Sequence, residues 1–190
     1  MTLGRMLAVT VGILALAGLA GCGDSRTPAP NLARIEPPHR LRVLSYLHNT
    51  LHLSAPANWS TETGSAPLVV TIGSGQAVVA IWRYPRSPSQ PLPSDIPALQ
   101  RARGALITAA AARDRTFRVI SSAVVGINSV PGVELDALET IRGQVRRVRS
   151  AHLYKRGAEL VIDEYAPENL FHQVDRTVFS PLLHSVHLVG

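Results

Sequence analysis

The feature that most constrains this chain is its single cysteine, Cys22. Ahead of it lie one basic residue, Arg5, and about fifteen almost purely apolar residues from Met6 to Ala20. A basic start, a short apolar segment and small residues before a cut are the parts of an export signal, and this segment is too short to span a bilayer as a helix. Whatever folds after Cys22 therefore folds outside the cytoplasm and without an internal disulfide.

The run Leu19-Ala20-Gly21-Cys22 resembles the lipobox of bacterial lipoprotein signal peptides. In lipoproteins the residue after the cut is a cysteine whose thiol carries a diacylglyceryl group. The resemblance implies a signal peptide at residues 1–21, an acyl anchor of the palmitate type on Cys22, and a place on the extracytoplasmic face of the cell membrane. A lipidated Cys22 also leaves no thiol for a metal site or a catalytic nucleophile. The alternatives are a buried core cysteine and an ordinary secretory signal.

Length and composition after the signal define two regions. Removal of residues 1–21 leaves about 170 residues, enough for one domain with a sizeable core. Residues 22–40 are polar and proline-rich, so we expect a lipidated N-terminus followed by an extended, mobile spacer. The globular domain is predicted to occupy residues 41–190.

The charge is basic and carried almost entirely by arginine. The formal net charge is +6, and Lys155 is the only lysine among 19 basic residues. This bias favours a GC-rich, actinobacterial genome over selection for phosphate binding. A basic surface would attract anionic lipid headgroups by roughly 1 kcal/mol per side chain. Nucleic acid is not an expected partner of an exported, tethered chain.

Hydrophobic patterns of period two predict most of the domain to be sheet. The predicted strands are residues 50–54, 68–72, 76–84, 117–125, 133–141, 144–154 and 158–165. Both faces of the strand at 76–84 are apolar, which predicts a central strand covered on two sides. Regular spacing and tight turns predict an antiparallel meander for the later strands.

Two segments show helical periodicity. Residues 94–97 carry N-cap chemistry and a first-turn proline, and apolar residues then recur at helical spacing up to about Arg113. A second pattern follows Pro167, and Pro181 is expected to kink that helix or to start a new turn with Ser180 as its cap. The order strands, helix, strands, helix predicts an α+β domain: one antiparallel sheet with packed helices.

Three segments carry a family resemblance: the proline-turn-tryptophan element Leu53–Trp59, the run Gly143–Tyr165 with its Ala166-Pro167 ending, and Phe171–His187. They resemble the PsbP-like fold, the α/β/α sandwich of the extrinsic photosystem II protein and of actinobacterial LpqN-like lipoproteins. The resemblance covers residues 45–190. It implies a binding or assembly module without a catalytic centre or a cofactor. Together with Cys22 it favours the lipoprotein branch over the photosynthetic one.

Seven histidines raise the question of a metal site. His48 and His52 fall in or beside a predicted strand, where four residues span about 13 Å, too far for two ligands of one ion. His184 and His187 lie near the C-terminus, and no carboxylate is spaced to complete a ligand set. We therefore expect no metal site.

Catalytic signatures are equally weak. Serine, histidine and aspartate occur, but without a Gly-x-Ser-x-Gly or Ser-x-x-Lys arrangement that prepares a nucleophile. The neighbouring carboxylates Asp163 and Glu164 are adjacent in a predicted strand and so point to opposite faces. We expect no enzyme, unless a hydrolase site is assembled without a motif.

The densest charge cluster contains Arg146, Arg147 and Arg149. The preceding predicted strand carries three acidic residues: Glu134, Asp136 and Glu139. One interpretation is a ladder of cross-strand ion pairs. The other is a basic face for an anionic lipid or an acidic partner, which makes the three arginines candidate binding residues.

The sequence thus favours a lipid-anchored, noncatalytic binding or assembly module of the cell envelope, with an envelope protein as its partner. The alternative is a carrier that encloses a lipid or another apolar ligand between its helices and its sheet. Abundant valine, leucine and alanine suit such a cavity, but they equally suit a filled core.

Overall fold

The structure is a computed structural model, and residues 34–189 are described. They belong to one compact unit, Asn31–Gly190. The predicted signal peptide, the lipobox residues Leu19, Ala20 and Gly21, and the predicted lipidation site Cys22 lie outside the described residues. Within residues 34–189, no helix is both long enough and apolar enough to cross a membrane.

A seven-stranded antiparallel sheet forms the middle layer of this unit, in the order β3-β4-β5-β9-β8-β7-β6. Its strands are β3 (Ser60–Thr63), β4 (Leu68–Ser74), β5 (Ala77–Pro85), β6 (Arg118–Ile127), β7 (Val130–Ile141), β8 (Gln144–Lys155) and β9 (Ala158–Pro167). The meander predicted for residues 117–165 is confirmed. β5 lies inside the sheet between β4 and β9, as its two apolar faces predicted.

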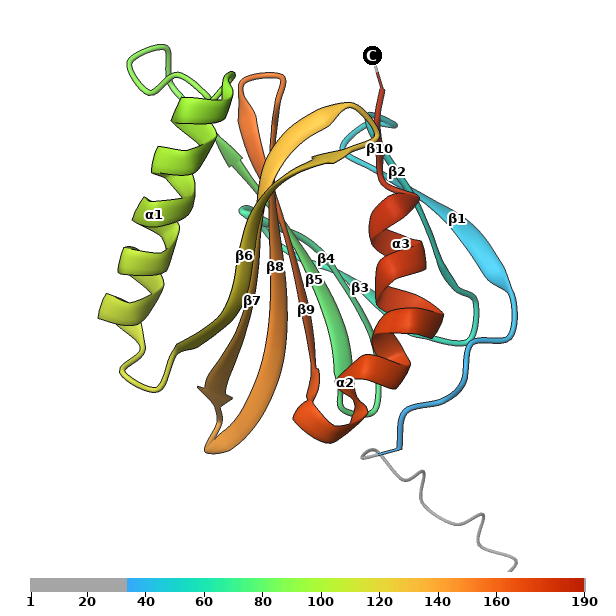
Figure 1. The fold of residues 1–190 in the computed structure, drawn as a ribbon. Helices are drawn as coiled ribbons and strands as arrows, with labels where there is room; N and C mark the ends of the chain where they lie inside the picture. Colours follow the sequence, from blue (N-terminus) through green and yellow to red (C-terminus); the bar gives the residue numbers. More distant parts are fainter. Residues whose placement is uncertain (1–33, 190) are drawn as a thin grey trace, which may run out of the picture. The chain divides into compact units, whose positions relative to one another are not determined.

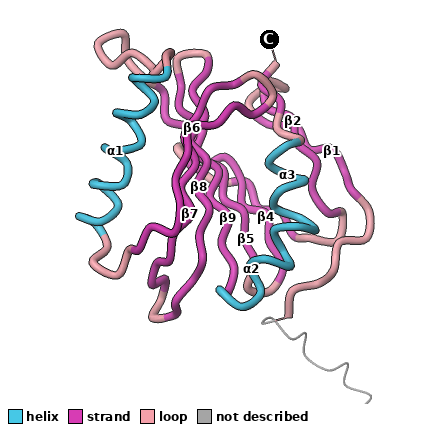
Figure 2. Tube along the Cα trace, viewed as in Figure 1, coloured by secondary structure: helices cyan, strands magenta, loops and turns pink. Residues whose placement is uncertain are grey.

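Helices cover both faces of this sheet (Figures 1 and 2). They are α1 (Ile96–Arg113), α2 (Glu168–Val174), the π-helical segment η1 (Asp175–Phe179) and α3 (Ser180–His184). α1 lies on one face against β6 and β7, and the continuous segment α2-η1-α3 lies on the other. The fold is therefore the predicted α/β/α sandwich.

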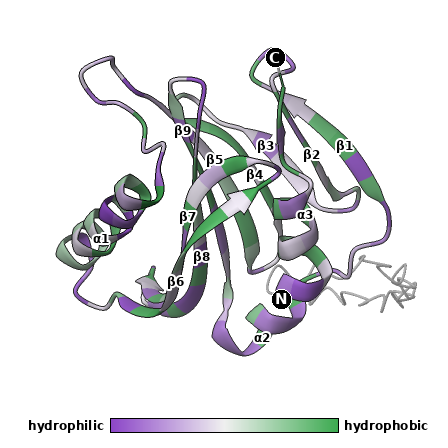
Figure 3. Ribbon diagram, turned by 45° about the horizontal axis from the view of Figure 1, so that its top comes forward, coloured by the Kyte–Doolittle hydropathy of each residue, from purple (hydrophilic) through white to green (hydrophobic). Residues whose placement is uncertain are grey.

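The sequence predicted one sheet, but β2, which overlaps the predicted strand 50–54, belongs to a second, three-stranded sheet in the order β1-β2-β10 on the same side as α2-η1-α3. Its strands are β1 (Leu41–Tyr46), β2 (Leu51–Pro56) and β10 (His187–Leu188). β2 buries Leu51 and Leu53 in the main core. β1 is an edge strand that contains both hydrophobic and hydrophilic residues (Figure 3), and its Leu41 and Val43 are 61% and 74% exposed.

Both ends of α1 match the sequence signals. The Asp95 carboxylate accepts a 2.7 Å hydrogen bond from the Ala98 backbone N–H, and a proline occupies the first turn. Leu99 packs with Val133 and Leu135 of the sheet. The predicted N-cap and the predicted end near Arg113 are confirmed.

The C-terminal helical segment corrects one expectation. Ser180 is not an N-cap, because its backbone is helical, with φ −60° and ψ −46°. Instead, one π-helical turn precedes Pro181, and the Ser180 N–H bonds to the carbonyl oxygen of Asp175, five residues back. This wider turn lets a residue without an N–H enter the helix without breaking it. The Ser180 hydroxyl donates to the Asp175 carboxylate at 2.8 Å.

Candidate binding groove

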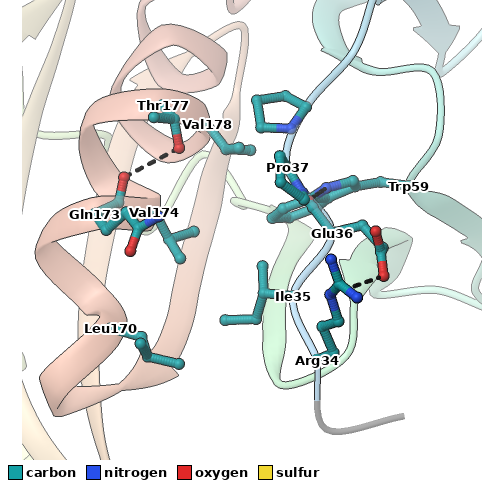
Figure 4. Close-up of a pocket in the computed structure, with 11 residues that line it drawn as sticks. Arg34, Ile35, Glu36, Pro37, Trp59, Leu170, Gln173, Val174, Thr177 and Val178 are labelled. Carbon is teal, nitrogen blue, oxygen red and sulfur yellow. Dashed lines mark hydrogen bonds and ion pairs between the residues drawn. The ribbon is translucent and has the colours of Figure 1, made fainter. Parts of the chain in front are cut away.

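A groove of about 300 Å³ opens between residues 34–38 and the helical segment α2-η1 (Figure 4). Trp59 forms part of its lining, and the apolar side chains of Ile35 and Val174 face each other across it. The remaining residues that line it are Arg34, Glu36, Pro37, Pro38, Leu170, Gln173, Thr177 and Val178. The groove thus combines an apolar interior with a polar rim, the usual composition of a small binding site.

Hydrogen bonds hold the N-terminal wall of the groove in place. The Trp59 indole N–H donates to the Glu36 carbonyl oxygen at 3.0 Å, and the Asn58 side-chain amide donates to the Pro37 carbonyl oxygen at 2.9 Å. The Glu36 N–H donates to the Ser74 hydroxyl at 2.9 Å. Residues 34–39, which the sequence predicted to belong to a mobile spacer, are therefore bound to the domain.

Gly75 allows this close approach. Its φ is +55°, and a Cβ atom at this position would lie 2.1 Å from the carbonyl oxygen of Arg34. Only glycine combines this backbone conformation with the necessary space. The turn between β4 and β5 thus determines whether the segment 34–38 can form its wall.

A buried ion cluster, formed by Arg149, Glu164, Asp175 and Ser180, fixes the opposite wall to the sheet. Arg149 contacts the Glu164 carboxylate at 2.6 Å and the Asp175 carboxylate at 2.8 Å, and it also donates to the Ser180 hydroxyl at 3.2 Å. Arg149 and Glu164 lie on β8 and β9, whereas Asp175 and Ser180 belong to the helical segment. The cluster therefore joins three elements beneath the groove.

Glu164 is the most unusual member of this cluster. It is 0% exposed, and its Oε1 has no hydrogen-bond partner within the described residues. Burial, helped by the negative charges of Asp175 and Glu134, raises its pKa to about 7 against the opposing effect of Arg149. This carboxyl group titrates near neutral pH although it contacts an arginine.

The three candidate arginines do not share one face. Arg147 and Arg149 lie on the α2 side of β8, whereas Arg146 lies on the α1 side, where it donates to the Gln76 carbonyl oxygen at 3.1 Å. Arg147 forms a two-point contact with Asp136, at 2.9 and 2.5 Å, and lies 4.9 Å from the ring centre of Phe171. The structure thus brings Arg147 and Arg149 into ion pairs with carboxylates of the domain.

A polar chain that the sequence motifs did not reveal lies under α1. Ser150 Oγ is 3.1 Å from His152 Nε2, and His152 Nδ1 is 2.7 Å from a Glu159 carboxylate oxygen. Arg86 pairs with the same carboxylate. However, the Ser150 hydroxyl donates to Asp163 at 2.5 Å, so its proton is directed away from the histidine. Ser150 and His152 are separated by an even number of positions on β8, as Glu159 and Asp163 are on β9, so each pair shares one face of its strand. This spacing on neighbouring strands could have indicated the cluster.

The polar side chains from Ser150 to Glu159 do not have the geometry of an activated nucleophile. Ser150 lies in the middle of β8, which is paired on both sides, so its backbone amide belongs to the sheet. A serine nucleophile needs a base that accepts its proton and free N–H groups for the oxyanion. Burial raises the pKa of Glu159, but hydrogen bonds from His152 and Arg86 outweigh it and lower the pKa overall. These hydrogen bonds join side chains of β8 to side chains of β9.

The histidines singled out in the sequence are dispersed. His52 contacts the Asn49 carbonyl oxygen at 2.9 Å, and His184 contacts the Ser180 carbonyl oxygen at 2.7 Å. Among residues 34–189, no three histidine, cysteine, aspartate or glutamate side chains are grouped to hold a metal ion.

Comparison with known proteins places the fold. No protein-family model and no curated protein matches the chain. Cyanobacterial PsbP from Synechocystis has a similar structure, with a TM-score of 0.61 and 11% identity over 90% of this chain and 99% of that one. LpqN of Mycobacterium tuberculosis, described as involved in cell envelope biogenesis, has a TM-score of 0.56 and 13% identity over 80% of this chain and 91% of that one. At these identities the likeness concerns architecture, and it confirms that the chain has a PsbP-like fold.

Proposed function

We propose that this protein is a noncatalytic binding or assembly module, attached to the extracytoplasmic face of the cell membrane through a diacylglyceryl group on Cys22. Its partner is an envelope protein that inserts apolar side chains into the groove. The observation that carries the proposal is the position of the groove: the segment that continues toward Cys22 forms one of its walls.

The size and lining of the groove suit part of a protein rather than a large ligand. A volume of about 300 Å³ lies at the lower end of known ligand sites. Its apolar floor is surrounded by exposed polar side chains such as Gln173 and Thr177. Buried apolar anchors within a polar rim are typical of protein interfaces.

The edge strand β1 adds a second feature that suits assembly. It starts directly after the groove wall, and its Leu41 and Val43 project into solvent. An edge strand also presents unpaired backbone groups on its free side, to which a partner strand can bind. The LpqN likeness supports an envelope role because that protein is described as acting in envelope biogenesis.

The experiment is site-specific photo-crosslinking in intact cells, with a photoreactive residue at Thr177. We expect a discrete protein adduct that disappears when Gln173→Arg fills the groove. His172→Arg is the matched control, because His172 is an exposed neighbour on α2 that does not line the groove. An adduct of equal yield in Gln173→Arg would reject the groove as the partner site.

The anchor is tested separately by Cys22→Ser. We expect the wild-type protein in the membrane fraction with a covalent lipid on Cys22, and the variant without that lipid. A wild-type chain that lacks the lipid would reject the anchor while leaving the groove to be judged by the crosslink.

The carrier alternative placed an apolar ligand between helices and sheet. Under α1 the structure has a pocket of only about 170 Å³, lined by Asp163, Ser150, His152 and Glu139 among others. Under α2-η1-α3 the main core fills the space, with Phe171 and Phe179 in contact at 5.6 Å between ring centres. Neither position favours an enclosed apolar ligand.

A further inference from the structure

A larger pocket, of about 650 Å³, opens at the other end of β1, between the two sheets. The turn after β1 forms one side of it, and the ends of β3, β4 and β5 form the other. Its lining is mainly apolar: Tyr46, Leu47, Ala66, Pro67, Leu68, Val69 and Pro85, with His48, Thr63, Gly64 and Arg83. Such a volume lies well inside the range of small-molecule sites.

A smaller pocket of about 170 Å³ adjoins it and shares two of its residues, Leu47 and Arg83. This second pocket is also lined by Lys155 and Arg156 from the turn between β8 and β9. The shared Arg83 therefore lies where the larger, mainly apolar pocket meets the smaller pocket that contains Lys155 and Arg156.

The basic residues at this junction lack acidic partners within the described part of the chain. Among residues 34–189, ion pairs join carboxylates to other cations, such as Arg86, Arg147 and Arg149. None of these pairs includes Arg83, Lys155 or Arg156. Arg83 is half-buried against apolar neighbours. An arginine in such surroundings attracts an anion more strongly than one in open water, because low-dielectric walls screen it less.

The turn that forms one side of the apolar pocket has an uncommon backbone conformation. Leu47, His48 and Asn49 have φ values of 54°, 54° and 64°. Asparagine tolerates the left-handed region, but it is unfavourable for leucine. Residues held in such conformations tend to occur at ligand sites.

We propose that this pocket binds a free single-chain anionic amphiphile of the fatty-acid type. The alkyl chain lies against Tyr46, Leu68 and Val69, and the carboxylate pairs with Arg83, with Lys155 and Arg156 adding positive charge. A guanidinium group binds a carboxylate through two parallel hydrogen bonds, and the apolar walls exclude water from the alkyl chain. This site does not depend on the partner groove or on the anchor.

The test is calorimetric titration of the chain from residue 22, with Cys22→Ser so that no lipid is attached. Laurate is the anionic probe, and dodecanol is the uncharged probe with the same chain length. We expect saturable binding of laurate that weakens roughly tenfold in Arg83→Gln, while dodecanol binding changes less than twofold. Arg101→Gln, an exposed position on α1, is the charge control and leaves both affinities unchanged.

A second variant pair tests the apolar pocket. Thr63 is exposed and lines it, whereas Glu62 precedes it on β3 and points to the opposite face of the sheet. Thr63→Trp should block laurate and dodecanol, and Glu62→Trp should block neither, in proteins with unchanged melting temperatures.

The proposal would be overturned by no saturable binding of laurate, by equal affinity for laurate in Arg83→Gln and the wild type, or by unchanged affinity in Thr63→Trp. Binding only to phosphatidylglycerol vesicles, with Thr63→Trp as effective as the wild type, would also overturn it. That result would identify the basic residues as a membrane surface instead.

Discussion

The indole nitrogen of Trp59 donates a hydrogen bond of 3.0 Å to the main-chain carbonyl oxygen of Glu36. Trp59 is 2% exposed and packs edge-on against Phe179, with 6.5 Å between ring centres. Glu36 is exposed and belongs to the segment that continues toward Cys22. This hydrogen bond therefore links the core to the segment that the proposed anchor would hold.

Trp59→Phe tests this link. Phenylalanine retains an aromatic ring but cannot donate to the Glu36 carbonyl oxygen, so we expect a loss of about 1 kcal/mol in the free energy of unfolding, plus the effect of the smaller ring. Hydrogen exchange at Ile35 and Glu36 should become faster, while amides of β8 and β9 keep their relative protection. Faster exchange at all amides alike would show that the bond does not hold the segment specifically.

Gly75→Ala should destabilise the protein more than the positive φ of Gly75 alone predicts. Both Gly75 and Gly143 have positive φ values, 55° and 76°, but a Cβ atom meets nothing within 4 Å at Gly143 and the Arg34 carbonyl at Gly75. Gly143→Ala should cost about 1 kcal/mol of stability. Gly75→Ala should cost more and should make the peptide bonds of residues 34–38 accessible to protease, as limited proteolysis would measure. Equal stability and equal cleavage in the two variants would contradict this role of Gly75.

Most strands of the main sheet were predicted from apolar runs bounded by turn residues, whereas β3, which buries no side chain, was not. β7 alternates buried and half-buried side chains from Val133 to Leu138, and the tight turns at its two ends left little choice of topology. β1 gave no such signal, because its exposed Leu41 and Val43 alternate with side chains that are only half-buried. Its pairing with β2, rather than its own burial, makes it a strand.

The groove was not predictable from local sequence. The proline-rich composition of residues 34–38 indicates an unfolded spacer, and their binding depends on Gly75 and Trp59, which are distant along the chain. The arginine cluster shows the opposite case. Strand alternation alone could have separated Arg146 from Arg147, whereas the partners of each arginine required the three-dimensional arrangement.

Arg149→Met should be strongly destabilising at alkaline pH. It leaves the buried Glu164 without its counter-ion, and breaking a buried pair from one side typically costs about 3–5 kcal/mol. The cost should fall at acidic pH, where Glu164 is neutral. Arg147→Met is the control, because the Arg147 side chain, which pairs with Asp136, is more exposed than the Arg149 side chain. We expect this variant to lose about 1 kcal/mol or less of stability.

The double variant Arg149→Met with Glu164→Met should recover most of the stability lost by Arg149→Met alone, because no buried charge then remains on β8 or β9 at this point. Urea denaturation of the four proteins would measure the coupling between the two sites. Additive losses would show that Arg149 acts through packing or through Asp175 rather than through Glu164.

The stability of the domain should depend on pH through Glu164. Its pKa is raised from an ordinary value of 4.5 to about 7 in the folded state. Between these two values the folded protein binds more protons than the unfolded chain, so the free energy of unfolding from this group falls as pH rises toward 7 and is constant above it. Glu164→Gln should remove this slope between pH 5 and pH 8, as urea denaturation at each pH would show.

Asp114→Asn is the control, because hydrogen bonds from Thr116 lower the pKa of Asp114 below its ordinary 3.8, so its contribution is lost only in more acidic solution. Parallel pH profiles for the wild type and Glu164→Gln would mean that Glu164 remains ionised throughout, held by Arg149.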